Sequence, residues 1–262
     1  MEIGALRPVQ DLSVAAWIAP RLRRPTGGEV GSVVPEGFKA YARILHPVPS
    51  VEATTWAAVG AATGRTPHAL MQWRAIAGVV EVTGRRWRTS RSTRTMEWPG
   101  QEPEEGNLDP AALAELLSIL ERHTATAEMC YFALWEGYGW ISGSPAVAID
   151  GSSEPIPPAF SPEVMAGPRL RHPLRDYLLF TGPLRAALAM GSRTGGWFPP
   201  QSPSIFWPQD RSWCVATEID FDSTLLGGSA GLIEAVLAHP VLEAWPVFPG
   251  NSLRYDTDTV NG

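Results

Sequence analysis

Cysteine is scarce in this chain, and its scarcity excludes some kinds of fold. Two cysteines, Cys130 and Cys214, among 262 residues are too few for a disulfide framework or a structural zinc site. Both lie in apolar, strand-like sequence, which is typical of buried thiols rather than nucleophiles.

Long apolar runs are missing as well. No stretch approaches the roughly 18 to 20 apolar residues that span a bilayer. The N-terminal residues lack the order of a signal peptide, because an acid comes first and the basic residues follow the apolar part. We therefore expect a cytoplasmic protein with no membrane partner.

Lysine is nearly absent, since Lys39 is the only one and the other basic residues are arginines. The net charge of −6 and the pI near 5.4 argue against a general nucleic-acid binder. The exception is residues 84–94, "GRRWRTSRSTR", where five arginines surround Trp87. Such a run is typical of a solvated strand or loop. The alternative is a site for an anionic ligand or an acidic partner.

The composition is that of a globular protein, with 44% hydrophobic and 18% charged residues. We find no repeat of 20–50 residues and no long flexible linker. We expect a single domain over residues 1–262, in which residues 1–34 form an irregular N-terminal arm. Two segments predict loops, the acidic residues 98–110 and the proline-rich, aromatic residues 195–210.

Five segments carry helix signals. These are residues 50–64, 66–78, 109–123, 182–191 and 227–240. The predicted N-caps are Ser50, Thr66, Asp109 and Ser229. In the third segment Leu113, Leu116, Leu117 and Leu120 form one apolar stripe, which predicts a core-facing helix.

Three segments have a composition typical of β-strands: residues 128–135, 176–180 and 212–221. We read Gly227 and Gly228 as a turn that leads from the last strand into a helix. The strands stand in hairpin-like contexts rather than in a regular βαβ repeat. The predicted class is therefore α+β, with a mixed, largely antiparallel sheet and helices packed on it. We expect the core to include the leucine stripe, residues 130–135 and 177–180, and the helix residues Leu232, Val236 and Leu237.

Three motifs carry a resemblance. "YFALWEGYGW", "YLLFTGPL" and "WPQDRSWCVATEIDFDSTLLGGS" occur in this order between residues 128 and 247. In them the chain resembles an actinobacterial family of uncharacterised proteins. The resemblance implies a shared fold and no particular activity.

The stretch "TEIDFDSTLLGG" resembles the Asp-x-Asp-x-Thr motif with which aspartyl-nucleophile phosphatases begin, through Asp220, Asp222 and Thr224. That motif needs a lysine and further acids on later strands. Only 38 residues follow Thr224, and none of them is a lysine. This activity, and that of an Asp-x-Asp glycosyltransferase, is therefore not expected.

Read as one strand, residues 213–221 alternate between two faces, and Glu218, Asp220 and Asp222 fall on the same side. Three carboxylates in a row need solvent, arginines or a cation such as Mg²⁺ or Ca²⁺. Arginine pairing is the favoured interpretation, with Arg211 or the arginines near Arg171 and Arg175 as partners. No metal is expected, so these acids are only weak metal candidates.

The sequence leaves two functions open. The first is a non-enzymatic protein that binds another protein, immunity-like or a regulatory adaptor, because eleven tryptophans occur without a complete catalytic motif. Its candidate contact residues are Trp135, Tyr138, Trp140, Trp197, Trp207 and Trp213. The second is an enzyme with an acidic site, whose candidate residues are Asp210, Arg211, Glu218, Asp220 and Asp222. No cofactor is expected, and aromatic residues that anchor loops in the core are the structural alternative.

Overall fold

The computed structural model describes residues 5–23, 28–50, 54–86, 89–145, 155–156, 158–172, 175–191 and 199–262. For residues 82–86, 89–93, 144–145 and 155–156 this description covers the backbone alone.

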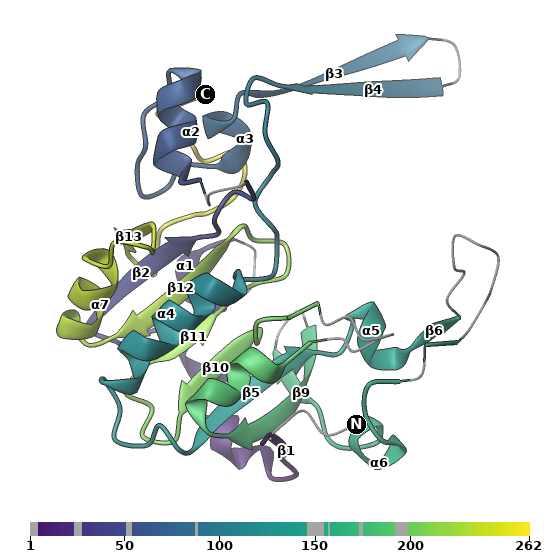
Figure 1. Cartoon of the computed structure of the whole chain (residues 1–262), viewed down its shortest axis with the longest axis vertical. Coiled ribbons are helices and arrows are strands. Elements are labelled where there is room, and N and C mark those ends of the chain that lie inside the picture. The colour runs from purple at the N-terminus through teal and green to yellow at the C-terminus, as the bar shows by residue number, and fades with distance from the viewer. Residues whose placement is uncertain are drawn as a thin grey trace.

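One large antiparallel sheet organises the chain (Figure 1). Within the described residues it has nine strands, in the order β1, β9, β5, β10, β11, β12, β2 and β13, with β8 beside β9. Their bounds are β1 Arg7–Pro8, β2 Ala40–Leu45, β5 Cys130–Trp135, β8 Leu170–His172, β9 Arg175–Gly182, β10 Ile205–Pro208, β11 Cys214–Ala216, β12 Ser223–Gly228 and β13 Ala244–Val247. The strand pairs among them are antiparallel, which confirms the predicted α+β class.

Helices cover one face of this sheet (Figure 1). They are α4 (Pro110–Glu121), α7 (Ala230–Leu237) and the 3-10 helix η3 (Leu184–Ala189). As predicted, the Asp109 side chain caps α4 and Ser229 caps α7. The leucine stripe of α4 is buried against the sheet, and so is the rest of the predicted core apart from the half-buried Trp135 and Leu237.

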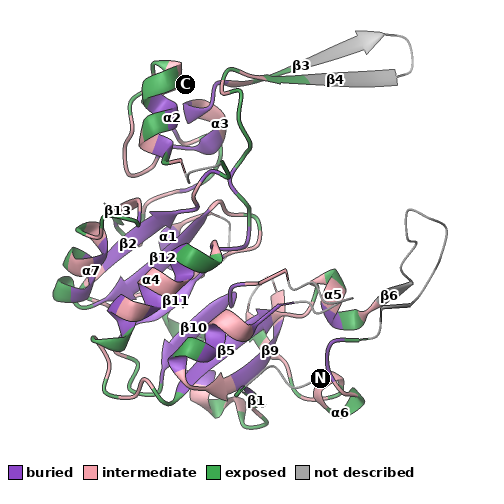
Figure 2. Ribbon diagram, viewed as in Figure 1, coloured by how far each residue is buried: buried purple, intermediate pink, exposed green. Residues whose placement is uncertain are grey.

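The N-terminal segment packs on the other face of the sheet. The strands of the sheet are buried along most of their length (Figure 2). The N-terminal segment contains η1 (Leu12–Ala15), η2 (Ala19–Arg21) and α1 (Val30–Val33). Trp17 packs edge-on against Trp207 of the sheet, with the ring centroids 6.1 Å apart. The segment predicted as an irregular arm thus contains short helices, and it supplies Ala15, Trp17, Ile18, Val30 and Val34 to the buried core on this face.

A smaller unit lies beyond the end of β2 (Figure 1). Its core joins α2 (Trp56–Thr63) and α3 (Trp73–Ile76) to residues that follow β2. From α3 the chain enters a hairpin of β3 (Val79–Arg86) and β4 (Thr89–Met96), which extends away from the body. The remaining short elements are α5 (Gly139–Ser142), β6 (Ser144–Pro145), β7 (Pro155–Ile156) and α6 (Pro162–Met165).

The helix predicted over residues 66–78 is wrong for most of its length, because only α3 forms there. Apart from the Met71 amide, which donates to the His68 carbonyl, several backbone groups before α3 bind distant side chains. The Met71 carbonyl accepts a hydrogen bond from Arg43 at 2.7 Å, and the Gln72 amide donates to Asp258 at 3.1 Å. Tertiary polar contacts therefore override the local helix signals.

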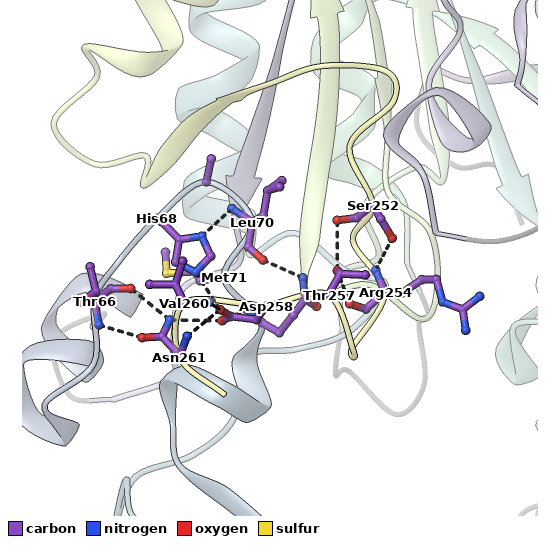
Figure 3. A network of polar contacts seen from close by, with 12 residues as sticks. Thr66, His68, Leu70, Met71, Ser252, Arg254, Thr257, Asp258, Val260 and Asn261 are labelled. Atoms are coloured by element: carbon purple, nitrogen blue, oxygen red, sulfur yellow. Dashed lines mark hydrogen bonds and ion pairs between the residues drawn. The ribbon is translucent and has the colours of Figure 1, made fainter.

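A clasp holds this segment to residues 252–261 (Figure 3). The Asp258 side chain is buried and lies 2.9 Å from Nε2 of His68. Asn261 bonds both the amide and the carbonyl of Thr66. Burial acts to raise the pKa of Asp258, but its hydrogen bonds outweigh burial and lower that pKa below the ordinary value.

Helix α2 also begins later than predicted. Thr55, not Ser50, caps it, and accepts a hydrogen bond from the amide of Ala58 at 3.1 Å. Residues 51–53 lie outside the described part of the chain.

The long strand predicted over residues 213–221 is also wrong, because β11 ends at Ala216. The amide of Thr217 still donates to the carbonyl of Ser204, but Phe221 then donates back to the carbonyl of Glu218. This turn reverses the chain into β12. The acids therefore lie in a loop, and the predicted alternation of faces does not apply to them.

The predicted Gly227–Gly228 turn is in fact the end of β12. A Cβ at Gly227 would lie 2.5 Å from the Phe38 ring, and one at Gly228 would lie 2.6 Å from Leu232. The two glycines thus leave room for side chains that pack on the strand, and the helix starts at its Ser229 cap.

A series of buried hydrogen bonds connects the end of β2 to β12. His46 follows β2, has no exposed surface and lies 2.6 Å, through Nδ1, from the carbonyl oxygen of Glu104. Its Nε2 lies 3.0 Å from the Thr224 hydroxyl, which lies 2.8 Å from that of Thr217. Burial lowers the pKa of His46 to about 4.

We predict that this histidine makes stability fall as the pH falls. Its ordinary pKa is 6.5, so below that value the unfolded chain binds a proton that the folded chain takes up only near pH 4. Between these values the free energy of unfolding loses up to about 3 kcal/mol. Urea unfolding at pH 7 and pH 4.5 should show a smaller loss for His46→Asn than for the wild type. Equal losses in the two proteins would contradict a neutral buried His46.

Candidate functional site

The structure separates two of the five candidate catalytic residues from the other three. Asp210 and Arg211 lie in the turn between β10 and β11, whereas residues 218–222 follow the other end of β11. Asp210 accepts hydrogen bonds from the hydroxyl of Thr124 and the amide of Ser212. The Arg211 guanidinium lies 5.7 Å from the ring centroid of Trp17. These contacts fix a turn.

Arg175 holds the next two acids. This arginine, at the start of β9, donates to Glu218 at 2.9 and 2.7 Å and to Asp220 at 2.6 Å. Its guanidinium also lies 5.2 Å from the ring centroid of Trp135. Glu218 is largely covered, whereas the Asp220 side chain is 74% exposed. Arginine pairing, the favoured interpretation of the acidic row, is what the structure shows.

The third acid belongs to a buried pair. Arg43 of β2 is 1% exposed and donates to Asp222 at 3.2 Å and to Ser223 at 2.9 Å. Its guanidinium lies 5.6 Å from the ring centroid of Trp56. Burial raises the pKa of Asp222, and the charge of Arg43 opposes that rise. The sequence analysis did not identify Arg43 as a partner, because it lies 179 positions away.

Two of the acids line a cavity of about 440 Å³, between the body of the sheet and the smaller unit. We name it the junction cavity. Its carboxylates are Glu102, Glu105, Asp220 and Asp222. Its arginines are Arg43, Arg74, Arg94 and Arg254, and Trp73 also contributes to its wall. Glu218 pairs with Arg175 instead and does not line the cavity.

Glu105 is the functional candidate that sequence analysis missed. It lies in the acidic loop before α4, where no motif singles out one acid from its neighbours. The residue is exposed, and its pKa is raised by the partial burial of its carboxylate and by the negative charges of Asp222 and Asp220. A carboxyl group with a raised pKa in a cavity is a candidate for ligand binding or proton transfer.

Metal and thiol chemistry find little support in the described part of the chain. Among its residues, no group of three or more histidine, cysteine, aspartate or glutamate side chains could hold a metal ion. Burial raises the pKa of the Cys130 thiol to about 12, and it raises that of Cys214 as well. Both are therefore protonated thiols at neutral pH, as expected of buried cysteines.

The aromatic candidates divide into two groups. Trp207 and Trp213 have no exposed surface, so neither can contact a partner, and we withdraw them as binding residues. Trp135, Tyr138 and Trp140 are half-buried and form a ladder, with centroids 5.2 and 6.4 Å apart. Trp197 lies outside the described residues.

No protein-family model, curated protein or solved structure matches this chain. Within the described residues, no helix has the length and apolar character to cross a membrane.

The two arginine pairs predict losses of stability of different size when one charge is removed. Asp222→Asn leaves the buried Arg43 without its carboxylate and should lower the free energy of unfolding by about 3 kcal/mol. Asp220→Asn removes an exposed partner and should cost less than about 1 kcal/mol. Thermal and urea unfolding of both variants measures the difference.

The same melts, run with Mg²⁺ or Ca²⁺, test the metal hypothesis. We expect neither cation to shift the melting temperature of the wild type. A rise in the melting temperature of the wild type that Asp220→Asn does not show would contradict arginine pairing as the role of these acids.

Proposed function

We propose that this protein is a non-enzymatic protein-binding protein, immunity-like or a regulatory adaptor, and that it contacts its partner through the β3–β4 hairpin. The observation that carries the proposal is the hairpin's projection from the body (Figure 1). Within the described residues β3 and β4 pair only with each other, so both outer edges carry unpaired backbone groups. Such edges can accept a strand from another chain.

The base of the hairpin is anchored, which suits a contact element. Arg74 of α3 pairs with Glu81 of β3 at 3.1 Å. Arg94 of β4 bonds Glu102 at 2.8 Å. Glu81 lies opposite Arg94 in the register of the hairpin, so the two ion pairs hold both strands at the same position along the hairpin. The rest of the hairpin extends beyond this level.

The charge of the hairpin indicates the kind of partner. Five of the arginines fall within residues 84–94, in a chain whose net charge is −6. A positive segment on an acidic protein attracts negatively charged surfaces, and it steers association with them. We therefore propose an acidic protein as the partner, and a cytoplasmic location remains part of this proposal.

A charge-reversal pair tests this function. Arg85→Glu/Arg86→Glu changes the hairpin, and Arg122→Glu/Arg185→Glu makes the same change in net charge on and beside α4. In affinity capture from the native host, the first double variant should lose a stoichiometric acidic partner at least tenfold, because it repels that partner. The second should capture it as the wild type does. Equal capture by both variants, or no stoichiometric partner, would contradict the proposal.

One observation favours the second candidate, an enzyme with an acidic site. Glu105, with its raised pKa, shares the junction cavity with Asp220 and Asp222, as a general acid would. Assays with nitrophenyl esters, glycosides and phosphomonoesters separate the candidates. We expect no turnover. Turnover that Glu105→Gln abolishes, and that Arg85→Glu/Arg86→Glu leaves intact, would favour the enzyme.

A further inference from the structure

We propose, as a step that rests on the proposed function, that the partner contributes an acidic extended segment and that this segment pairs as an added strand with the outer edge of β4. The backbone groups at the edges of the two sheets, the prolines at those edges and the charges of the hairpin support this mode of binding.

The edge strand β13 of the large sheet has little to offer an added strand. In an antiparallel pair, residues that exchange hydrogen bonds alternate with residues whose N–H and C=O groups face away. The Leu45 amide donates to the carbonyl of Glu243, so the backbone groups of Ala244 and Pro246 face away from β2. Pro246 has no N–H to donate. Proline at such a position is a common way to block an edge strand.

The opposite end of this sheet is closed in the same way. The Val9 amide donates to the carbonyl of Leu179 at 2.8 Å, so the backbone of Pro8 in β1 faces away from β9. The other strand on this side of β9 is β8, which is only three residues long. Very short edge strands also discourage pairing with another chain. Within the described residues, both ends of the large sheet are therefore protected.

The edges of the hairpin lack this protection. The Glu97 amide donates to the carbonyl of Gly78 at 3.3 Å. Arg86 pairs with Thr89 across a two-residue connection, which sets the same alternation. The residues whose backbone groups face outward are Val79, Glu81, Thr83 and Arg85 on β3, and Ser90, Ser92, Arg94 and Met96 on β4. None of them is a proline, so each keeps one N–H donor and one C=O acceptor.

The two edges differ in charge, and the difference favours β4. The sequence of β4, TSRSTRTM, has two arginines and no acid. β3 has as many arginines, but it also has Glu81, which would repel an acidic strand, and Gly84, which weakens strand pairing. Within the chain itself, Arg94 of β4 already donates to the carboxylate of Glu102 at 2.8 Å. The occupant that fits this edge is therefore acidic and extended.

The same charges make a second copy of this chain a poor occupant. Two hairpins that paired edge to edge would bring their arginines onto neighbouring strands, where like charges are destabilising. Basic residues along an open edge are one way in which proteins prevent self-association. The edge of β4 thus selects against its own kind and for an acidic strand.

Calorimetric titration of the full chain with capped synthetic peptides tests the mode of binding. In the first peptide glutamate and valine alternate, which gives it negative charge and strand propensity. In the second, glutamate and proline alternate, so the charge is the same but the peptide cannot join a ladder. In the third, lysine and valine alternate. We expect the first peptide to bind at least tenfold more tightly than the other two.

Prolines placed at the same position on the two edges identify the strand. Ser92 and Thr83 lie opposite each other in the register of the hairpin. Ser92→Pro removes an outward N–H from β4 without removing a hydrogen bond between β3 and β4, and should weaken binding of the glutamate–valine peptide at least tenfold. Thr83→Pro makes the same change on β3, and Ser92→Ala keeps the N–H. Both of these variants should bind the peptide as the wild type does.

Four results would overturn strand addition to β4. These are equal binding of the glutamate–proline peptide, no binding of the glutamate–valine peptide, wild-type binding by Ser92→Pro, and an equal loss of binding in Thr83→Pro. Sedimentation of the wild type should show a monomer. A dimer that Ser92→Pro abolishes would make a second copy the occupant and would also overturn the proposal.

Capture from the native host keeps this result separate from the proposed function. Ser92→Pro should lose the acidic partner, as Arg85→Glu/Arg86→Glu does. If the charge variant loses the partner and Ser92→Pro keeps it, the hairpin binds by charge alone, so the strand proposal fails and the proposed function stands. Absence of any captured partner would contradict the proposed function, whatever the peptides show.

Discussion

The buried guanidinium of Arg43 is the interaction on which the rest of this structure depends. It reaches from β2, the strand next to the edge strand β13, to the carbonyls of Ala69 and Met71, and to Asp222 and Ser223. A buried charge is tolerated only where its hydrogen bonds and its counter-ion are all in place. The need to satisfy one arginine therefore fixes the loop after β11 and the segment before α3 at the same time.

This constraint explains why the smaller unit takes the form it does. The segment before α3 gives its carbonyls to Arg43 on one side and an amide to Asp258 on the other, so it cannot close into a helix. The clasp of Asp258 and Asn261 then adds residues 252–261 to the unit (Figure 3). Both segments contribute to the wall of the junction cavity, through residues 72–74 and 253–255, so Arg43 and Asp258 help to fix its shape.

The contrast between α4 and the acidic loop shows what sequence can and cannot predict. Helix α4 was predictable because its cap, Asp109, and its leucine stripe are local signals that agree with the final packing. The strand over residues 213–221 was mispredicted because its end depends on the turn from Glu218 to Phe221 and on arginines far away in the chain. The acids were identified as a cluster and Arg175 was among the candidate partners, but Arg43 was not, since it comes from a strand 179 positions earlier in the chain.

The same reasoning accounts for Glu105. An alternating pattern draws attention to acids on a strand, whereas a loop acid among other acids carries no pattern. Glu105 becomes distinct only after folding, when its neighbours across the cavity have been matched with arginines from the sheet and it has not. Among the described carboxylates that line the junction cavity, those with arginine partners fix the loops of its wall, and the exposed Glu105 is the one left without such a partner.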